Sequence, residues 1–164
     1  MFTTDELNKV CKLNPINDRL LPFHFTHLKL MTFRQSEINL FKSFSDYAER
    51  IKTYPIKGLS FSGISEKEIV CCFGLIPIWH GVYEAWLIPS LHISNKKFVF
   101  HRASLRFFKY VAKKLSIHRI QINVSRSNYL AYKWAKSCYF LEEGILEKFG
   151  PDKSDYYMMS RLFN

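Results

Sequence analysis

The stretch VSRSNYLAYKWAKSCYF, residues 124–140, is the most informative part of this chain about its fold. It continues the segment RIQINV, residues 119–124, whose alternating apolar side chains predict a strand. Asn128 can cap a helix that follows this strand, and Ala131 and Trp134 then lie one turn apart on the buried side of that helix. A strand that leads directly into a packing helix is typical of sheets covered by helices.

The periodicity of apolar residues extends this pattern along the chain. We expect strands over residues 27–34, 56–63, 68–81, 82–90, 119–124, 144–150 and 155–163. Helices are expected over residues 36–55, 95–115 and 127–137. The unit from 82 to 124 requires parallel strands with a right-handed crossover. We therefore predict an α/β (α+β) fold with a mixed central sheet of about six to seven strands and helices on both faces. One domain is expected over 1–164, with an N-terminal extension, 1–26, that contains a short helix.

Composition excludes several classes of protein. The 164 residues are 48% hydrophobic and 16% aromatic, which is too apolar for a disordered chain. No run of about 18 uncharged apolar residues occurs, so no membrane-spanning helix is expected. The N-terminal sequence MFTTDELNKV lacks the apolar core of a secretory signal, and we expect none.

The four cysteines show no metal-binding or disulfide pattern. Cys71 and Cys72 are adjacent in an expected strand, so their side chains should point to opposite faces of the sheet. There is no CxxC pair and no histidine pair at metal spacing. We expect reduced, partly buried thiols and no metal site.

The formal charge of +10 is concentrated in one part of the chain. Residues 95–136 contain eleven Lys and Arg and no Asp or Glu, so a positive face is expected that attracts nucleic acid, a nucleotide-bearing cofactor or an acidic protein. One helical stripe within it is a candidate nucleic-acid or anion face: Arg102, Arg106, Lys109 and Lys113. A merely solvated helix face is the alternative.

The chain resembles the GNAT superfamily of N-acetyltransferases over about Leu28 to Phe163. In that family the strand matching 119–124 is followed by Asn, by Ala three residues later, by a hydrophobic residue and by a strand that begins Gly-Phe. Those places are held here by Asn128, Ala131, Trp134 and Phe140, and residues 141–163 resemble the final hairpin of the family.

The resemblance implies a site for acetyl-CoA where strand 82–90 splays from strand 119–124. Leu87 and Ile88 would line this opening, and Asn128 and Ala131 would lie beside the CoA arm. A backbone N–H on Leu87–Pro89 would polarise the thioester carbonyl, and we expect a β-bulge that frees it. The family's pyrophosphate loop maps onto three residues that are not glycine: His92, Asn95 and Lys97.

This departure leaves acetyl-CoA binding open. No glycine occurs from Val82 to Glu143, so close backbone approach to a phosphate is lost. Basic side chains could bind the phosphates by charge instead: Lys96, Lys97, His101 and Arg102.

The resemblance also suggests residues for proton transfer. Glu84 matches a strand position that often carries the general base, and His80 and His92 are alternative bases. A solvated or salt-bridged strand carboxylate is the other interpretation of Glu84. The tyrosine that often serves as general acid is replaced by Ala135, and Tyr132 is a nearby candidate acid.

Three functions are compatible with these residues. The first is N-acyl transfer from acyl-CoA to an amine acceptor. The second is a catalytically silent binding module for a virion or host protein, because small GNAT-like bacteriophage proteins with eroded phosphate loops look similar. The third is nucleic-acid binding through residues 95–136. In each case we expect a cytoplasmic location. If a phage encodes the chain, the expected location is the host cytoplasm or the virion.

Overall fold

The computed structural model describes residues 2–44 and 46–164. These residues form one seven-stranded sheet in the order β1-β2-β3-β4-β5-β7-β6. The strands are β1 (Asp18–Pro22), β2 (Leu59–Ser65), β3 (Glu68–Trp79), β4 (Val82–Pro89), β5 (Arg119–Ser125), β6 (Leu141–Leu146) and β7 (Tyr156–Leu162). All neighbours are antiparallel except β4 and β5, which are parallel. The predicted mixed α/β sheet is confirmed.

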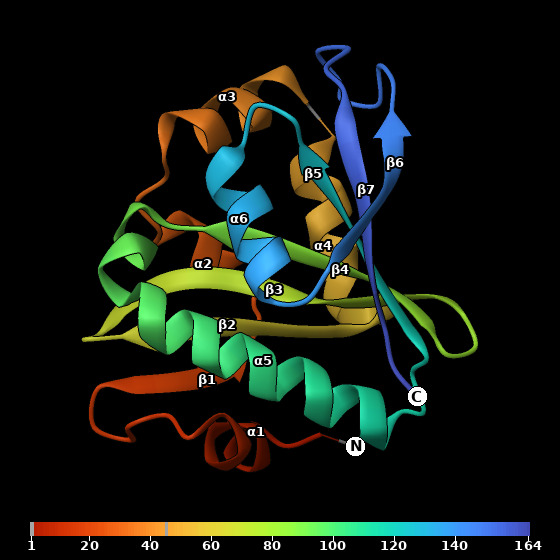
Figure 1. The fold of residues 1–164 in the computed structure, drawn as a ribbon. Coiled ribbons are helices and arrows are strands. Elements are labelled where there is room, and N and C mark those ends of the chain that lie inside the picture. The colour runs from red at the N-terminus through yellow and green to blue at the C-terminus, as the bar shows by residue number, and fades with distance from the viewer. Residues whose placement is uncertain (1, 45) are drawn as a thin grey trace.

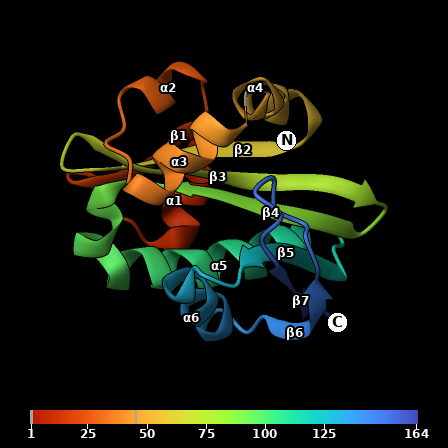
Figure 2. The ribbon, with the colours of Figure 1, turned by 90° about the horizontal axis from the view of Figure 1, so that it is seen from above.

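Helices cover both faces of this sheet (Figures 1 and 2). One face, which we call the α4 face, carries α2 (Thr26–Lys29), α3 (Gln35–Ser43) and α4 (Tyr47–Lys57). The opposite α5 face carries α1 (Thr4–Cys11), α5 (Lys97–Lys114) and α6 (Tyr129–Ser137). A six-residue 3₁₀ helix, η1 (Leu91–Lys96), joins β4 to α5.

Each face of the sheet has its own hydrophobic core, because alternate strand residues point to opposite sides. The α5 face buries Ile120, Ile122 and Val124 of β5, as the alternation in RIQINV predicts. Cys71 and Cys72 lie in different buried clusters, which confirms that they point to opposite faces. Burial raises the pKa of Cys71 to about 12 and that of Cys72 to about 11, so both thiols are neutral near pH 7.

The prediction of a strand at 27–34 is wrong. This segment begins as α2, with Leu28 and Met31 buried and Leu30 72% exposed. Burial three residues apart fits a helical turn, and the apolar–polar alternation was too short to decide against it. The first strand is instead β1, in which Leu20 is the one buried residue of a five-residue edge strand.

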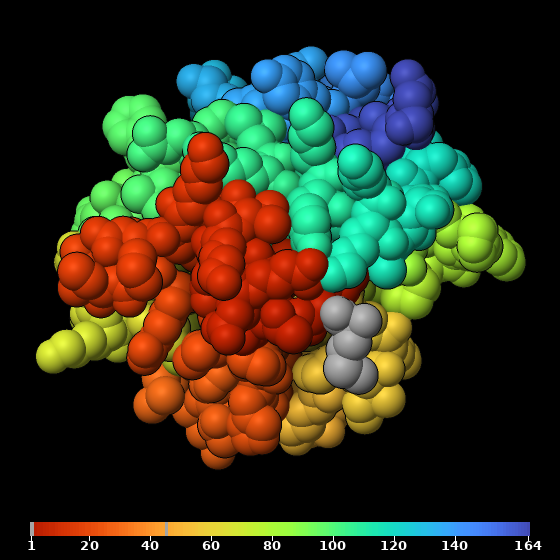
Figure 3. Space-filling view, turned by 90° about the horizontal axis from the view of Figure 1, so that it is seen from below, coloured from red at the N-terminus to blue at the C-terminus, as the bar shows by residue number. Residues whose placement is uncertain are grey.

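The N-terminal segment is integrated with the rest of the fold. Its strand β1 pairs with β2, and α1 packs against α5. Figure 3 shows this segment, in red, lying against α5 and covering the middle of the face in view. Residues 2–26 therefore contribute both a strand and a core helix.

The single helix predicted at 36–55 is two helices, α3 and α4. Phe44 has an extended backbone that ends α3, and α4 continues past Pro55 to Lys57. Among the described residues, no helix has the length and hydrophobicity needed to cross a membrane.

The last hairpin begins earlier than predicted, at Leu141 rather than Gly144. A register shift between Glu142 and Gly144 leaves Glu143 free to turn toward Arg119 of β5. The Arg119 guanidinium holds both carboxylate oxygens at 2.8 and 2.5 Å, and Ser160 adds a third hydrogen bond. These contacts lower the pKa of Glu143 to about 2, so it is ionised near pH 7.

Helix α6 ends in a Schellman motif, with Tyr139 where glycine is usual. The Phe140 N–H donates to Ala135 O and the Tyr139 N–H donates to Lys136 O, both at 3.0 Å. Tyr139 has φ 67°, in the left-handed region that disfavours residues with a Cβ. This backbone conformation directs the chain so that Phe140 enters the core, where it is 0% exposed.

We predict that Tyr139→Gly will be more stable than Tyr139→Ala by about 1 kcal/mol. Both substitutions remove the ring, which lies 5.4 Å from the Arg161 guanidinium carbon, so their difference reports the backbone conformation. Urea denaturation followed by circular dichroism measures both free energies of unfolding. Equal stabilities, or a more stable alanine variant, would contradict the prediction.

Candidate active site

The two parallel strands separate along their length. The ladder between β4 and β5 joins Val82 to Arg119, Tyr83 to Ile120 and Glu84 to Gln121, and it ends there. Figure 1 shows β5 turning away from β4 together with β7 and β6. The backbones of β4 and β5 therefore diverge in a V toward their carboxyl ends, as the resemblance implied, and we call this divergence the opening.

This divergence leaves backbone donors of β4 without a neighbouring strand. The Ser90 N–H donates to Val70 O across the β3–β4 pair. Because backbone groups alternate in direction along a strand, the N–H groups of Ile88 and Trp86 also point to β3, whereas that of Leu87 points toward the opening.

The β-bulge expected near Leu87 is not found. The β3–β4 register is regular from Tyr83 to Pro89, and its irregularity lies in β3 between Pro77 and Trp79. Even without a bulge, the Leu87 N–H has no ladder partner on β5, because the β4–β5 pairing ends at Glu84.

The segment at the mouth of the opening differs from an open phosphate loop. Ser90 caps η1, its Oγ accepting a hydrogen bond from the His92 N–H at 3.0 Å, and the Ile93 N–H donates to Ser90 O. Amides of this turn are thus already used within the 3₁₀ helix. Asn95 and Lys97 are exposed at its end, where α5 starts.

Two of the basic residues here contact carboxylates of the β2–β3 turn. Lys96 Nζ lies 2.5 Å from Glu66 Oε1, and His92 Nε2 lies 3.5 Å from Glu68 Oε2. The hydrogen bond to Glu66 raises the pKa of Lys96. The positive charge of Lys96 is therefore partly neutralised from within the chain.

Helix α6 flanks the opening from the α5 face. Asn128 is its N-cap, with Oδ1 accepting from the Ala131 N–H at 3.1 Å. Trp134 stacks on Phe100 of α5 with ring centroids 5.4 Å apart, which joins the two helices. The expected packing role of this stretch is confirmed.

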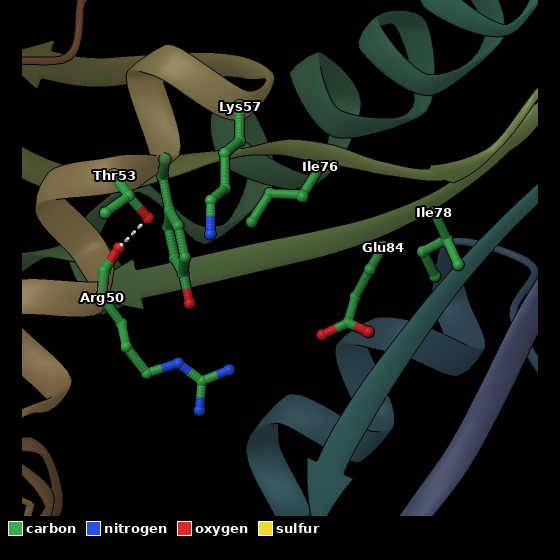
Figure 4. A pocket seen from close by; sticks show the side chains of 7 residues that line it. Arg50, Thr53, Lys57, Ile76, Ile78 and Glu84 are labelled. Atoms are coloured by element: carbon green, nitrogen blue, oxygen red, sulfur yellow. Dashed lines mark hydrogen bonds between the residues drawn. The ribbon is translucent and has the colours of Figure 1, made fainter.

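Glu84 lies at the apex of the opening, in the last paired position of β4, with its side chain on the α4 face. It lines a hollow of about 220 Å³ between α4 and the β3–β4 hairpin (Figure 4). Among the described residues, none with positive charge lies within 4 Å of its carboxylate, so the salt-bridged alternative is not observed.

The other candidate catalytic residues lie elsewhere. His80 is exposed at the β3–β4 turn, where β4 and β5 are still paired. The Tyr132 hydroxyl donates to Glu142 Oε2 at 3.0 Å, and this bond raises the pKa of Tyr132. His101, which was a candidate for phosphate binding, lies against the end of α6, with Nδ1 3.2 Å from Ser137 Oγ.

The proposed anion stripe of α5 is interrupted by α1. Arg106 donates to the backbone oxygen of Cys11 at 2.9 Å, and together with Arg102 it lines a hollow of about 320 Å³ beside the end of α1. Lys109 and Lys113 remain exposed. The four cations thus do not form one open face.

Six of the seven residues that line the hollow at Glu84 were not predicted from the sequence. Two are Ile76 and Ile78 of β3, and the other four belong to one side of α4: Arg50, Thr53, Tyr54 and Lys57. Their i, i+3, i+4, i+7 spacing was visible, but nothing local distinguished it from a solvated helix face.

Comparisons with solved structures agree with this geometry. The microcin C7 self-immunity acetyltransferase MccE, solved with acetyl-CoA and AMP, matches at TM-score 0.70 and 19% identity, over 93% of this chain and 95% of that chain. A GNAT-family acetyltransferase from Bacillus anthracis matches at TM-score 0.68 and 19% identity, over 89% and 95%. A spermidine N-acetyltransferase SpeG chimera from Vibrio cholerae and hSSAT matches at TM-score 0.64 and 19% identity, over 89% and 95%.

Sequence comparison alone gives no match, either to a protein-family model or to a curated protein. The likeness therefore lies in the arrangement of the strands and helices. This chain has the fold of the GNAT superfamily of acetyltransferases.

Proposed function

We propose that the chain is an acyl-CoA-dependent N-acyltransferase that moves an acetyl group from acetyl-CoA to an amine. The observation that carries this proposal is the end of the β4–β5 ladder at Glu84. A carboxylate then stands at the apex of the opening, with a free backbone donor, the Leu87 N–H, three residues further on. The complex of the similar MccE with acetyl-CoA supports the choice of donor.

The residues along the opening and those at its mouth fit acetyl-CoA to different degrees. Leu87 would line the pantetheine arm from β4, and Asn128 and Ala131 would flank it from α6. Ile88 is 3% exposed and its N–H points to β3, so we do not expect it to contact the arm. With amides of η1 engaged, the phosphates would be held by side chains at the mouth: His92, Asn95, Lys96 and Lys97. Acetyl-CoA, when bound, supplies an acyl group activated as a thioester.

The residues of this chain would assist the transfer in two ways. The Leu87 N–H would donate to the carbonyl oxygen as negative charge develops there. As the C–N bond forms and the C–S bond breaks, the amine nitrogen loses one proton, and the Glu84 carboxylate would accept it. Tyr132 could protonate the departing sulfur only after its hydroxyl leaves Glu142.

Calorimetric titration with acetyl-CoA, followed by an assay of thiol release with an amine panel, tests the proposal. We expect micromolar binding and amine-dependent release of CoA. If acetyl-CoA does not bind at about 1 mM, the acyltransferase proposal is wrong.

A catalytically silent binding module is the second candidate. The use of His92 and Ile93 amides within η1, together with the absence of a glycine cradle, favours it. Failure of acetyl-CoA to bind would support this candidate, and salt-sensitive retention of DNA would point instead to nucleic-acid binding.

The Glu66–Lys96 contact makes a separate prediction about the donor site. Glu66→Gln should lower the Kd for acetyl-CoA about threefold, because it frees the Lys96 ammonium at the mouth of the opening. Glu147→Gln, which changes the net charge equally at an exposed residue after β6, is the control. Calorimetry measures both, and an equal change in the two variants would contradict a local role for Glu66.

A further inference from the structure

The hollow at Glu84 combines surfaces from three elements (Figure 4). Arg50, Thr53, Tyr54 and Lys57 come from successive turns of α4, Ile76 and Ile78 from β3, and Glu84 from β4. Figure 4 shows the Arg50 guanidinium and the Lys57 ammonium on the helix side of the hollow and the Glu84 carboxylate on the strand side. The volume of about 220 Å³ suits a small molecule.

Within the described part of the chain, the charged groups of this hollow have no charged partners. Over residues 2–44 and 46–164, no opposite charge lies within 4 Å of Arg50, Lys57 or Glu84. Burial is the largest cause of the raised pKa of Tyr54. The positive charge of Arg50 lowers this pKa and the negative charge of Glu84 raises it, so both charges act on the Tyr54 hydroxyl. Two unpaired cations and one carboxylate give the hollow a net positive charge.

We propose that the acceptor of this site is an amine that also carries a carboxylate or phosphate group. This inference rests on the proposed acyl transfer and adds the class of acceptor. Glu84 faces the amine, while Arg50 and Lys57 bind the anionic group, for which a guanidinium offers paired donors. A polyamine would bring excess positive charge to a site that is already positive.

The fold alone does not determine the charge of the acceptor. One structure of similar fold is named a spermidine N-acetyltransferase, and another was solved with AMP beside acetyl-CoA. Acceptors of opposite charge are thus compatible with one architecture, and the side chains that line the acceptor hollow must select between them.

Binding of four amines to the protein without acetyl-CoA tests the proposal. The probes are O-phosphoethanolamine, β-alanine, ethanolamine and spermidine, and the readout is the NMR shift of the Ile76 and Ile78 methyl signals. We expect the phosphate- or carboxylate-bearing amine to bind at least about tenfold more tightly than ethanolamine, and spermidine to bind most weakly. Comparison of the first two probes distinguishes phosphate from carboxylate. Equal or tighter binding of spermidine would overturn the proposal.

A charge-matched pair of variants isolates the hollow from the overall charge. Arg50→Gln/Lys57→Gln should reduce the preference for the anionic amines over ethanolamine to within about twofold. Lys29→Gln/Lys42→Gln removes two exposed cations of α2 and α3 and should leave that preference unchanged. An equal loss in both variants would show that general electrostatics, rather than this hollow, selects the ligand.

These measurements distinguish failure of the inference from failure of the proposed function. Acceptor binding is observed without acetyl-CoA, so a chain that lacks acetyl transfer can still show the predicted preference. Conversely, acetyl transfer to amines regardless of their charge would retain the function and reject the acceptor class.

Discussion

Phe140→Ala is expected to lower the free energy of unfolding by about 3–4 kcal/mol. The side chain is 0% exposed and packs edge-on against Phe108 of α5, with ring centroids 5.4 Å apart. Its N–H also closes the Schellman motif on Ala135. Removing the ring would leave a cavity at the point where α6, α5 and the sheet meet.

Urea denaturation monitored by circular dichroism measures this loss. Phe149→Ala is the matched control, because Phe149 is 53% exposed and should cost less than about 1 kcal/mol. Similar losses for the two variants would show that Phe140 does not anchor the core.

Glu84→Gln is expected to reduce kcat for acetyl transfer about 100-fold, because the amide has the shape of the carboxylate but cannot accept the amine proton. The Kd for acetyl-CoA should stay within about twofold, since the expected donor contacts lie on Leu87, α6 and the η1 segment. Steady-state kinetics with the preferred amine and calorimetry with acetyl-CoA separate the two effects.

His80→Gln is the control for the identity of the base. His80 is exposed at the closed end of the β4–β5 pair, so this variant should change kcat less than about twofold. A large loss in His80→Gln combined with a small loss in Glu84→Gln would transfer the role of base to His80.

Much of the fold could be predicted from local sequence. The apolar alternation of residues 119–124 and the helical spacing after Asn128 correspond to β5 and α6. The two strands on either side of the His80–Gly81 turn correspond to the hairpin β3–β4. These elements are long or have a strong apolar period, so their own residues indicate which side of each element is buried.

Other elements had no such pattern. The edge strand β1 buries Leu20 alone, and α2 shares its apolar spacing with a short strand. In both places the contacts with distant segments, rather than the local sequence, select the conformation.

Local sequence is enough to predict the mixed sheet with its covering helices, the cap at Asn128 and a carboxylate on the strand that ends at the opening. It does not predict that Arg50 and Lys57 lie with Glu84 in one hollow, or that Glu66 contacts Lys96 at the mouth, because these contacts depend on packing. Periodicity records which side of an element is buried, whereas the charge of a site depends on which elements, distant in sequence, the packing brings together.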